Sequence, residues 1–548
     1  MKLKNIYKTT ASVILGALMI TSCTKLDQKV YSVVPNDQFW QTPDQIAAGI
    51  APAYQALTGI PNGAYYNLTE ATTDEQIVPT RGGDWYDNGN WQALWMHTYS
   101  PTLGPVNDAW NSIYNGIGKI NFTLSIVDNL ENKPANIENI DAELKTLRAY
   151  YYFLAMDMFG NVPLVTDFNV DPSSVTTVER ADVFTFVEKE LKDNLPLLNR
   201  TVDLSTYGKV TAYFAHCVLA KIYLNAEVYT GTARWADCVS QCDSIISSGK
   251  YSLQPQYFDN FAVQNSGSVE NIFVVPYDNV NIGGNSWEMQ TLHYNNQINF
   301  QLSGQPYNGF CSAAAFYNQF DTTSDYIVKG ENTYRTFHDA RAGQYLIGQQ
   351  YKTPFTYPPN QDVLYSSTDA SLKLRDEERN TDVIFTPNIT KFSDASSAFR
   401  QAGVRNIKYF PEAGTSGNQS NDMVIFRLAD FLLMKAEALV RLGSDLPTAL
   451  GLVNQVRERA YGGDVSHDWT AGDLTLDHIL AERGREMAWE TWRRQDLIRY
   501  EVASGKQYYG AARVPEKPAD PADGHLNIFP IPEPQITANP NLTQNPGY

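Results

Sequence analysis

Cysteine is scarce in this sequence. The 548 residues include five cysteines, and only Cys217, Cys238, Cys242 and Cys311 follow Cys23. Cys238 and Cys242 lie four residues apart in a helical pattern, a spacing that suits a metal-binding pair. The chain has no CxxC motif, however, and only seven histidines to complete a ligand set. We therefore predict buried thiols, with a metal site or a disulfide as the alternative, and we expect no cofactor.

Positive charge is also in short supply. Lys and Arg number 42 against 60 Asp and Glu, which gives a formal net charge of −18. Binding to a nucleic-acid backbone or to an anionic membrane face needs clustered basic residues, so the composition argues against both. Charged residues make up 19% of the chain and apolar residues 43%. This balance supports a packed core and excludes a generally disordered chain.

No hydrophobic run is long enough to cross a bilayer. The apolar stretch from Ala11 to Ile20 follows three lysines and falls short of the ~18 residues that a spanning helix needs. Residues 20–23, Ile-Thr-Ser-Cys, match a lipobox, at which bacterial lipoproteins are cleaved and acylated. We therefore predict a lipoprotein signal peptide at 1–22, a lipidated Cys23, and an extended leader and lipid tether at 23–45. An ordinary signal peptide or a buried first helix is the alternative.

Established catalytic motifs are missing as well. The sequence contains no HExxH, no GxSxG, no P-loop and no GxGxxG after a strand. The sequence therefore offers no recognisable catalytic template. Paired carboxylates of a glycoside hydrolase stay open as an alternative, because 60 acidic residues always offer pairs.

Helical periodicity dominates what is present. Residues 46–60 and 107–130 show it, whereas the Gly-, Asp- and Trp-rich stretch 70–106 is typical of a loop. Two-helix units then recur, with small residues on the first helix and a short turn between the two; they lie at 143–159 with 182–195, 210–226 with 235–248, and 424–442 with 446–460. These units resemble tetratricopeptide repeats of irregular spacing, and a generic helical bundle is the alternative.

The middle of the chain has a different composition. Residues 251–420 are rich in Asn, Gln, Tyr, Gly and Ser, with short strand-like runs such as 271–275. We expect a loop-rich, strand-poor ligand-binding insert between the helix pairs at 140–250 and 424–500, all within one domain over 46–548. The Pro- and Gly-rich residues 505–548 predict an extended tail over the surface.

One predicted helix, 482–499, is rich in arginine. It interleaves Glu, Asp and Arg with Trp489 and Trp492. An anion-binding site is one interpretation. We favour a structural helix, in which charges spaced three and four apart pair while the tryptophans pack in the core.

A tryptophan-rich loop is the best candidate for a binding site. Four of the ten tryptophans lie between 85 and 110, and we expect Trp95 and Trp110, which have apolar neighbours, in the core. Aromatic rings stack on the C–H faces of sugars, while charged and amide groups bind the hydroxyls. The predicted ligand-binding residues are Arg81, Asp84, Trp85, Asn90 and Trp91 of this loop, together with Trp287 and Tyr294 of the insert.

Motifs along nearly the whole chain resemble those of the SusD/RagB family of Bacteroidetes lipoproteins. They are Leu26-Asp27 after the lipobox, Thr73-Asp74-Glu75, the helix from Arg148 that ends in Phe159-Gly160-Asn161-Val162-Pro163-Leu164, Arg427-Leu428-Ala429 to Ala436-Glu437-Ala438, Glu482 to Arg499, and Asn539 to Tyr548. Each motif is weak alone, but together they are specific.

The resemblance implies a fold of tetratricopeptide-like helix pairs and a function in nutrient binding without catalysis. It implies a lipid-anchored protein on the outer face of the outer membrane that captures a glycan and passes it to a SusC-like TonB-dependent transporter. Residues 80–85 look like the sugar-binding loop of glycan-binding members. Some relatives take peptides, which remains an alternative. In one respect the chain departs from the family. Family members tend to carry acidic residues soon after the lipidated cysteine as a surface-export signal, whereas residues 24–27, Thr-Lys-Leu-Asp, are only mildly acidic.

Overall fold

The computed structural model describes residues 39–548. The predicted signal peptide, the lipidation site Cys23 and most of the predicted leader lie outside the described residues. The described residues divide into two units, residues 39–49 with 130–134 and residues 50–129 with 135–548. In the smaller unit the Trp40 ring lies against Gly49, where an added Cβ would come within 2.3 Å of it. Apart from the first residues of helix α2 (Pro43–Gln55), the structural description that follows concerns the larger unit.

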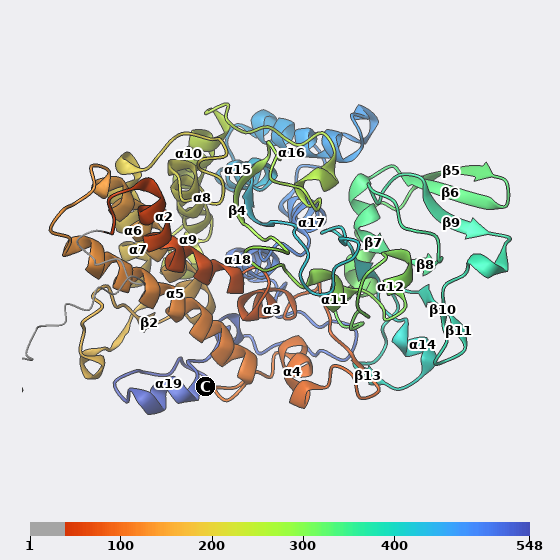
Figure 1. Ribbon diagram of the computed structural model, residues 1–548, viewed down its shortest axis with the longest axis horizontal. Helices are drawn as coiled ribbons and strands as arrows, with labels where there is room; N and C mark the ends of the chain where they lie inside the picture. Colours follow the sequence, from red (N-terminus) through yellow and green to blue (C-terminus); the bar gives the residue numbers. More distant parts are fainter. Residues whose placement is uncertain (1–38) are drawn as a thin grey trace, which may run out of the picture. The chain divides into compact units, whose positions relative to one another are not determined.

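Helices account for most of the regular structure (Figure 1). The described helices are α2 (Pro43–Gln55), α3 (Ala64–Glu70), α4 (Asn90–Met96), α5 (Gly104–Asp128), α6 (Ile137–Phe159), α7 (Arg180–Asn194), α8 (Ala212–Leu224), α9 (Ala226–Thr230), α10 (Trp235–Ile246), α11 (Trp287–Thr291), α12 (Asn296–Asn299), α13 (Ala314–Tyr317), α14 (Ser397–Arg400), α15 (Leu428–Leu442), α16 (Leu446–Ala460), α17 (Leu476–Met487), α18 (Arg493–Ser504) and α19 (Glu533–Ala538). None of them is long and apolar enough to cross a membrane.

The three predicted helix pairs are confirmed. Helix α6 packs on α7, α8 on α10, and α15 on α16, and α10 also packs on α15. Local signals set their ends: the Thr211 hydroxyl accepts a hydrogen bond from the Phe214 N–H at the start of α8, and Gly443 ends α15 with φ 62°. One boundary prediction is wrong, because residues 424–427 extend a strand rather than begin α15.

The strands are short, and most of them lie within the insert 251–420, where they form sheets of two or three strands. This confirms a mainly helical fold with a loop-rich insert. They are β1 (Thr80–Arg81), β2 (Val162–Pro163), β3 (Thr177–Val178), β4 (Asn271–Val275), β5 (Ser324–Lys329), β6 (Asn332–Phe337), β7 (Tyr345–Leu346), β8 (Gly348–Gln349), β9 (Val363–Ser367), β10 (Arg375–Asp376), β11 (Thr381–Asp382), β12 (Ile384–Phe385), β13 (Ser393–Asp394), β14 (Arg405–Asn406) and β15 (Met423–Arg427). In Figure 1 the helices α6 to α10 and the strands β5, β6 and β9 lie at opposite ends of the larger unit.

The predicted helix at 482–499 is two helices. Helix α17 ends at Met487 and α18 begins at Arg493, because Trp489 and Thr491 adopt left-handed φ values of 60° and 72°. Buried carboxylates satisfy the backbone there, since Glu75 accepts from the Trp489 N–H and Glu70 from the Thr491 N–H, each at 2.6 Å. The structural interpretation is confirmed, because both indoles, Trp489 and Trp492, are buried.

Buried arginines of neighbouring elements pair with the acids of this segment. Arg427 of β15 lies 2.8 Å from Glu270 and Glu490 and 2.5 Å from Glu486. Burial alone would raise the pKa of Glu486, but Arg459, Arg427 and Arg341 outweigh it and lower that pKa to about 2. The network therefore joins β15, α16 and α17 through charges that water does not reach.

The cysteines of the described chain are buried thiols. Cys217, Cys238, Cys242 and Cys311 are all free and buried, and the sulfurs of Cys238 and Cys242 lie 4.0 Å apart, beyond a disulfide bond. This confirms the thiol interpretation for these four residues.

Candidate ligand-binding site

A tight turn displays the tryptophan-rich loop. Strand β1 pairs in parallel with β13, and the backbones of Arg81 and Asp84 then exchange hydrogen bonds of 3.0 and 3.2 Å. Gly82 has φ 69°, and Trp85 itself has φ 62°, a conformation that costs about 1–3 kcal/mol for a residue with a side chain. The predicted loop 70–106 is not wholly irregular, because residues 90–96 form α4.

The indole of Trp85 is half-buried and held in one orientation. Its Nε1–H donates to the Tyr307 carbonyl at 2.7 Å, and its ring centroid lies 5.8 Å from that of Trp91 and 5.5 Å from that of Phe310. Its six-membered ring rests on Gly309, where an added Cβ would come within 2.3 Å. The ring is therefore pre-positioned, which lowers the entropic cost of binding a ligand.

We call the hollow beside this indole the Trp85 pocket. It holds about 520 Å³ and is lined by Asp84, Trp85, Asp87, Tyr294, Gln305, Pro306 and Tyr307. The Tyr294 hydroxyl donates to Asp84, and burial together with this carboxylate raises the pKa of Tyr294 to about 12. The phenol therefore stays neutral at physiological pH and keeps its proton for this hydrogen bond.

A second, smaller hollow shares Trp85. It holds about 250 Å³ and is lined by Asn62, Gly63, Tyr66, Asn67, Trp85, Trp91, Trp287, Gln290 and Phe310. The two hollows together give rings, carboxylates, amides and a phenol around one half-buried indole. Such a mixture suits a neutral ligand with many hydroxyl groups and an apolar face.

The structure brings three of the seven predicted residues to the Trp85 pocket, namely Asp84, Trp85 and Tyr294. Trp91, 9% exposed, packs edge-on against Trp85, lines the smaller hollow and donates from its Nε1–H to Asp87 at 2.6 Å. Asn90 is half-buried at the start of α4 and lines neither hollow. The core positions predicted for Trp95 and Trp110 are confirmed.

Arg81 is a correction, and Trp287 lies deeper than an exposed binding residue would. Arg81 is 3% exposed, and its guanidinium donates to the carbonyls of Gly309 at 3.3 Å and Ala402 at 2.7 Å. The Arg81 side chain therefore ties the loop to the segments around residues 309 and 402, and it is too buried to contact a ligand. Trp287 is 2% exposed because its ring packs on Tyr409 and Trp489, so it forms the floor of the smaller hollow.

Sequence reasoning missed four residues of the pocket, Asp87, Gln305, Pro306 and Tyr307. Tyr307 is 48% exposed, and its backbone carbonyl fixes Trp85. The signal was present in the run Gly304-Gln305-Pro306-Tyr307-Asn308, which combines an aromatic ring with turn-forming and amide residues. Nothing local in that run indicates that it meets residue 85.

Comparisons with known proteins place the chain. The profile described as "SusD family" matches residues 269–548, and one described as "Starch-binding associating with outer membrane" matches residues 26–224. The chain belongs to the SusD family. This confirms the resemblance drawn from the motifs.

Individual SusD-family proteins match over most of their length. The chain is 24% identical to "Starch-binding protein SusD" of Bacteroides thetaiotaomicron, covering 88% of this chain and 85% of that protein. It is 25% identical to "SusD-like protein P2" of Formosa agariphila, covering 99% of each. Among solved structures, "Surface glycan-binding protein A from Bacteroides thetaiotaomicron in complex with laminarihexaose" superimposes with a TM-score of 0.66 at 19% identity, covering 92% of this chain and 100% of that one. The likeness to this solved structure establishes the fold.

Proposed function

We propose that this protein binds glycans at the cell surface through the Trp85 pocket and passes them, uncleaved, to a SusC-like TonB-dependent transporter in the outer membrane. One observation carries the proposal: Trp85 is held by the Tyr307 carbonyl in a strained backbone conformation beside Tyr294 and Tyr307. A hydrophobic ring kept half-exposed at such a cost is typical of a binding site.

The relatives support the ligand class. One is named for starch binding, and a structural neighbour is described in complex with laminarihexaose, a glucan fragment. The family description adds association with the outer membrane. Lipidation at Cys23 supplies the anchor in this proposal, because two or more acyl chains hold a protein stably where one does not.

The composition of the pocket suits capture followed by release. An indole gives a stacking face, while Asp84, Asp87 and Gln305 offer acceptors and donors to sugar hydroxyls. A protein that hands its ligand onward must let it go, so modest affinity from stacking and a few hydrogen bonds fits this role better than an enclosing cavity does.

The test combines a glycan array with calorimetry on the glycans that bind. Trp85→Ala should weaken binding about 5- to 30-fold, because a stacking ring contributes on the order of 1–2 kcal/mol. Its melting temperature should stay close to that of the wild type, since a half-buried loop side chain contributes little to the core. Trp469→Ala is the matched control, because Trp469 is also half-buried but lines neither hollow.

Four outcomes count against the proposal. Equal binding by wild type and Trp85→Ala would move the site elsewhere. Equal loss in Trp469→Ala would point to general destabilisation. Release of reducing ends from a bound glycan by the purified protein would favour a glycoside hydrolase, and binding of peptides alone would favour the peptide-binding alternative.

A further inference from the structure

Arg335 on β6 has no ion-pair partner. Within residues 39–548 the structure gives its guanidinium no carboxylate, and its buried Nε–H has no hydrogen-bond acceptor. The guanidinium carbon lies 4.2 Å from the ring centroid of Phe337 and 5.5 Å from that of Tyr365. Arg335 is half-buried, and most fully buried arginines, such as Arg341 and Arg427, contact carboxylates directly.

This arrangement leaves a cation partly out of water, with two aromatic rings beside it but no counterion. Burial lowers the pKa of Arg335, and the neighbouring tyrosines 317, 326 and 365 only partly oppose the shift. A desolvated charge without a counterion costs free energy, which an anion placed on the guanidinium would offset. The site is therefore short of one negative group.

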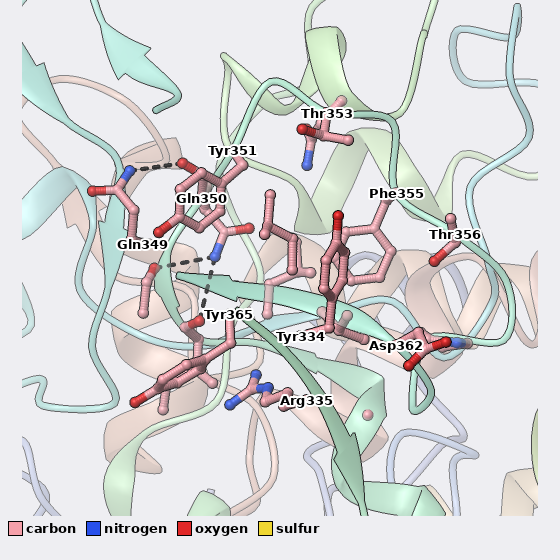
Figure 2. Close-up of a pocket in the computed structure, with 18 of the residues that line it drawn as sticks. Tyr334, Arg335, Gln349, Gln350, Tyr351, Thr353, Phe355, Thr356, Asp362 and Tyr365 are labelled. Atoms are coloured by element: carbon pink, nitrogen blue, oxygen red, sulfur yellow. Dashed lines mark hydrogen bonds between the residues drawn. The ribbon is translucent and has the colours of Figure 1, made fainter. Parts of the chain in front are cut away.

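A pocket beside Arg335 has room for that group. It holds about 450 Å³, within the range of small-ligand sites, and we call it the Arg335 pocket. Figure 2 shows Tyr334, Arg335, Gln349, Tyr351, Phe355 and Tyr365 around it, contributed by β6, β8, β9 and the segment 351–356. None of its lining residues belongs to the Trp85 pocket.

The lining specifies the ligand further. Tyr365 is 47% exposed and stands over Arg335, so it offers a ring face next to the positive charge. Gln349 donates its Nε2–H to the Gln350 carbonyl at 2.7 Å, which leaves its Oε1 to accept from a hydroxyl. Asp362 is the one acidic residue of the lining, and Lys329 lies 3.5 Å from it. The pocket therefore suits an anionic ring with hydroxyl groups.

We propose that the Arg335 pocket is a second glycan subsite that takes an acidic sugar residue, with the carboxylate or sulfate on Arg335 and the ring against Tyr365. Guanidinium groups bind the paired oxygens of such anions through two parallel hydrogen bonds. The inference rests on the proposed function for its ligand class, but it concerns a different pocket. It predicts that the protein distinguishes charged from neutral glycans.

The experiment uses pairs of probes that differ only in charge. One pair is tetragalacturonate and its methyl ester, and the other is a sulfated galactan tetrasaccharide and its desulfated form. Calorimetry should show that wild type binds at least one acidic probe at least about tenfold more tightly than its neutral partner. Which acidic probe binds distinguishes a carboxylate ligand from a sulfate ligand.

Variants assign the binding to this pocket. Arg335→Gln and, independently, Tyr365→Ala should each lose that discrimination; Tyr365 is exposed, so its variant tests the site even where Arg335→Gln folds poorly. Arg375→Gln is the matched control, because Arg375 is a partly exposed arginine outside the pocket that pairs with Asp382. Trp85→Ala should weaken glycan binding at the Trp85 pocket but should not abolish the discrimination.

The results that overturn this proposal differ from those that overturn the proposed function. If no acidic probe binds wild type, or if Arg335→Gln and Tyr365→Ala discriminate as wild type does, the Arg335 pocket is not this subsite. In either case, the proposed function still holds if neutral glycans bind the wild type and Trp85→Ala weakens their binding. If Trp85→Ala or Arg375→Gln also abolishes the discrimination, the charge preference does not belong to the Arg335 pocket.

Discussion

At the scale of single residues, the position of one ring depends on a glycine far along the chain. The Trp85 indole rests on Gly309, and the absence of a side chain there is what allows the contact. Gly309 shows no left-handed φ, so an alanine at 309 changes only the space available. The shape of the pocket therefore follows from two residues that no local pattern connects.

Gly309→Ala should weaken glycan binding at the Trp85 pocket about fivefold or more. The added Cβ would lie 2.3 Å from the Trp85 ring, so the indole must move out of its orientation. Calorimetry with a glycan that binds wild type checks this. Gly267→Ala, whose Cβ would meet nothing within 4 Å, should bind as wild type does. Unchanged affinity in Gly309→Ala would mean that the ring orientation does not matter.

Glu288 is a buried carboxyl group that lacks a positive partner. Its Oε1 accepts from the Gly417 N–H at 2.7 Å, and its Oε2 has no partner. Burial raises the pKa of Glu288 to about 7 from an ordinary 4.5. The folded state thus keeps a proton that the unfolded state releases, and stability falls as pH rises from about 4.5 to 7.

Glu288→Gln should remove this pH dependence, since its side chain keeps the acceptor for Gly417 and never ionises. The unfolding free energy of the variant minus that of wild type should rise by on the order of 3 kcal/mol between pH 4.5 and 8. Urea denaturation of both proteins across this range measures the difference, in which all other titrating groups cancel. A difference that does not vary with pH would show that the pKa of Glu288 is the same in the folded and the unfolded state.

At the scale of elements, the break between α17 and α18 shows how tertiary contacts end a helix. Periodicity in 482–499 favours one continuous helix, but Trp489 turns inward and its Nε1–H donates to the Glu75 carbonyl and the Ser312 hydroxyl, each at 3.2 Å. The Thr73-Asp74-Glu75 motif therefore has a structural role here. The Glu75 carboxylate accepts a hydrogen bond from the Trp489 N–H, and Asp74 forms an ion pair with Arg493 at 2.8 Å.

Trp489→Ala should lower the unfolding free energy by about 3–5 kcal/mol, through lost burial and the cavity left among Trp287, Glu75 and Ser312. Glycan affinity should hold wherever the variant is folded. Denaturation and calorimetry on the same sample test both statements. Unchanged stability together with lost binding would reverse the structural assignment.

At the scale of the whole molecule, buried ion pairs tie distant segments together. Glu437 of α15 binds Arg499 of α18 at 2.8 Å, and Arg483 of α17 binds Asp430 and Asp496 at 2.9 and 2.8 Å. Removing one member of such a set leaves a buried charge unpaired, which typically costs 3–5 kcal/mol. The family motifs at 427–438 and 482–499 therefore share one network.

Attachment to the membrane also concerns the molecule as a whole. We predict that Cys23→Ala prevents acylation and moves the protein from the membrane fraction to the soluble fraction, because no other thiol lies next to the apolar stretch 11–20. Palmitate labelling and fractionation measure this, with Cys242→Ala as a control that keeps the label. Undiminished labelling of Cys23→Ala would exclude the lipobox.

The fold was largely readable from the sequence because its signals are local. The pairs α6–α7, α8–α10 and α15–α16 follow from helical periodicity with Gly and Thr at their ends, and β4 covers the residues that the apolar run 271–275 predicts. The buried positions of Trp95, Trp110 and Trp489 follow in the same way from apolar neighbours or charge spacing.

The binding site was readable only in part, because burial depends on partners remote in sequence. The sequence predicts that Arg81 is available for a ligand, but its guanidinium donates hydrogen bonds to carbonyls 228 and 321 residues away. Trp287 is buried because its ring packs on Tyr409 and Trp489. The sequence by itself determined the helix pairs and the loop that carries Trp85. Only the tertiary structure decided which of the loop's side chains face the pocket, since that choice rests on packing and hydrogen bonds between segments that no local pattern relates.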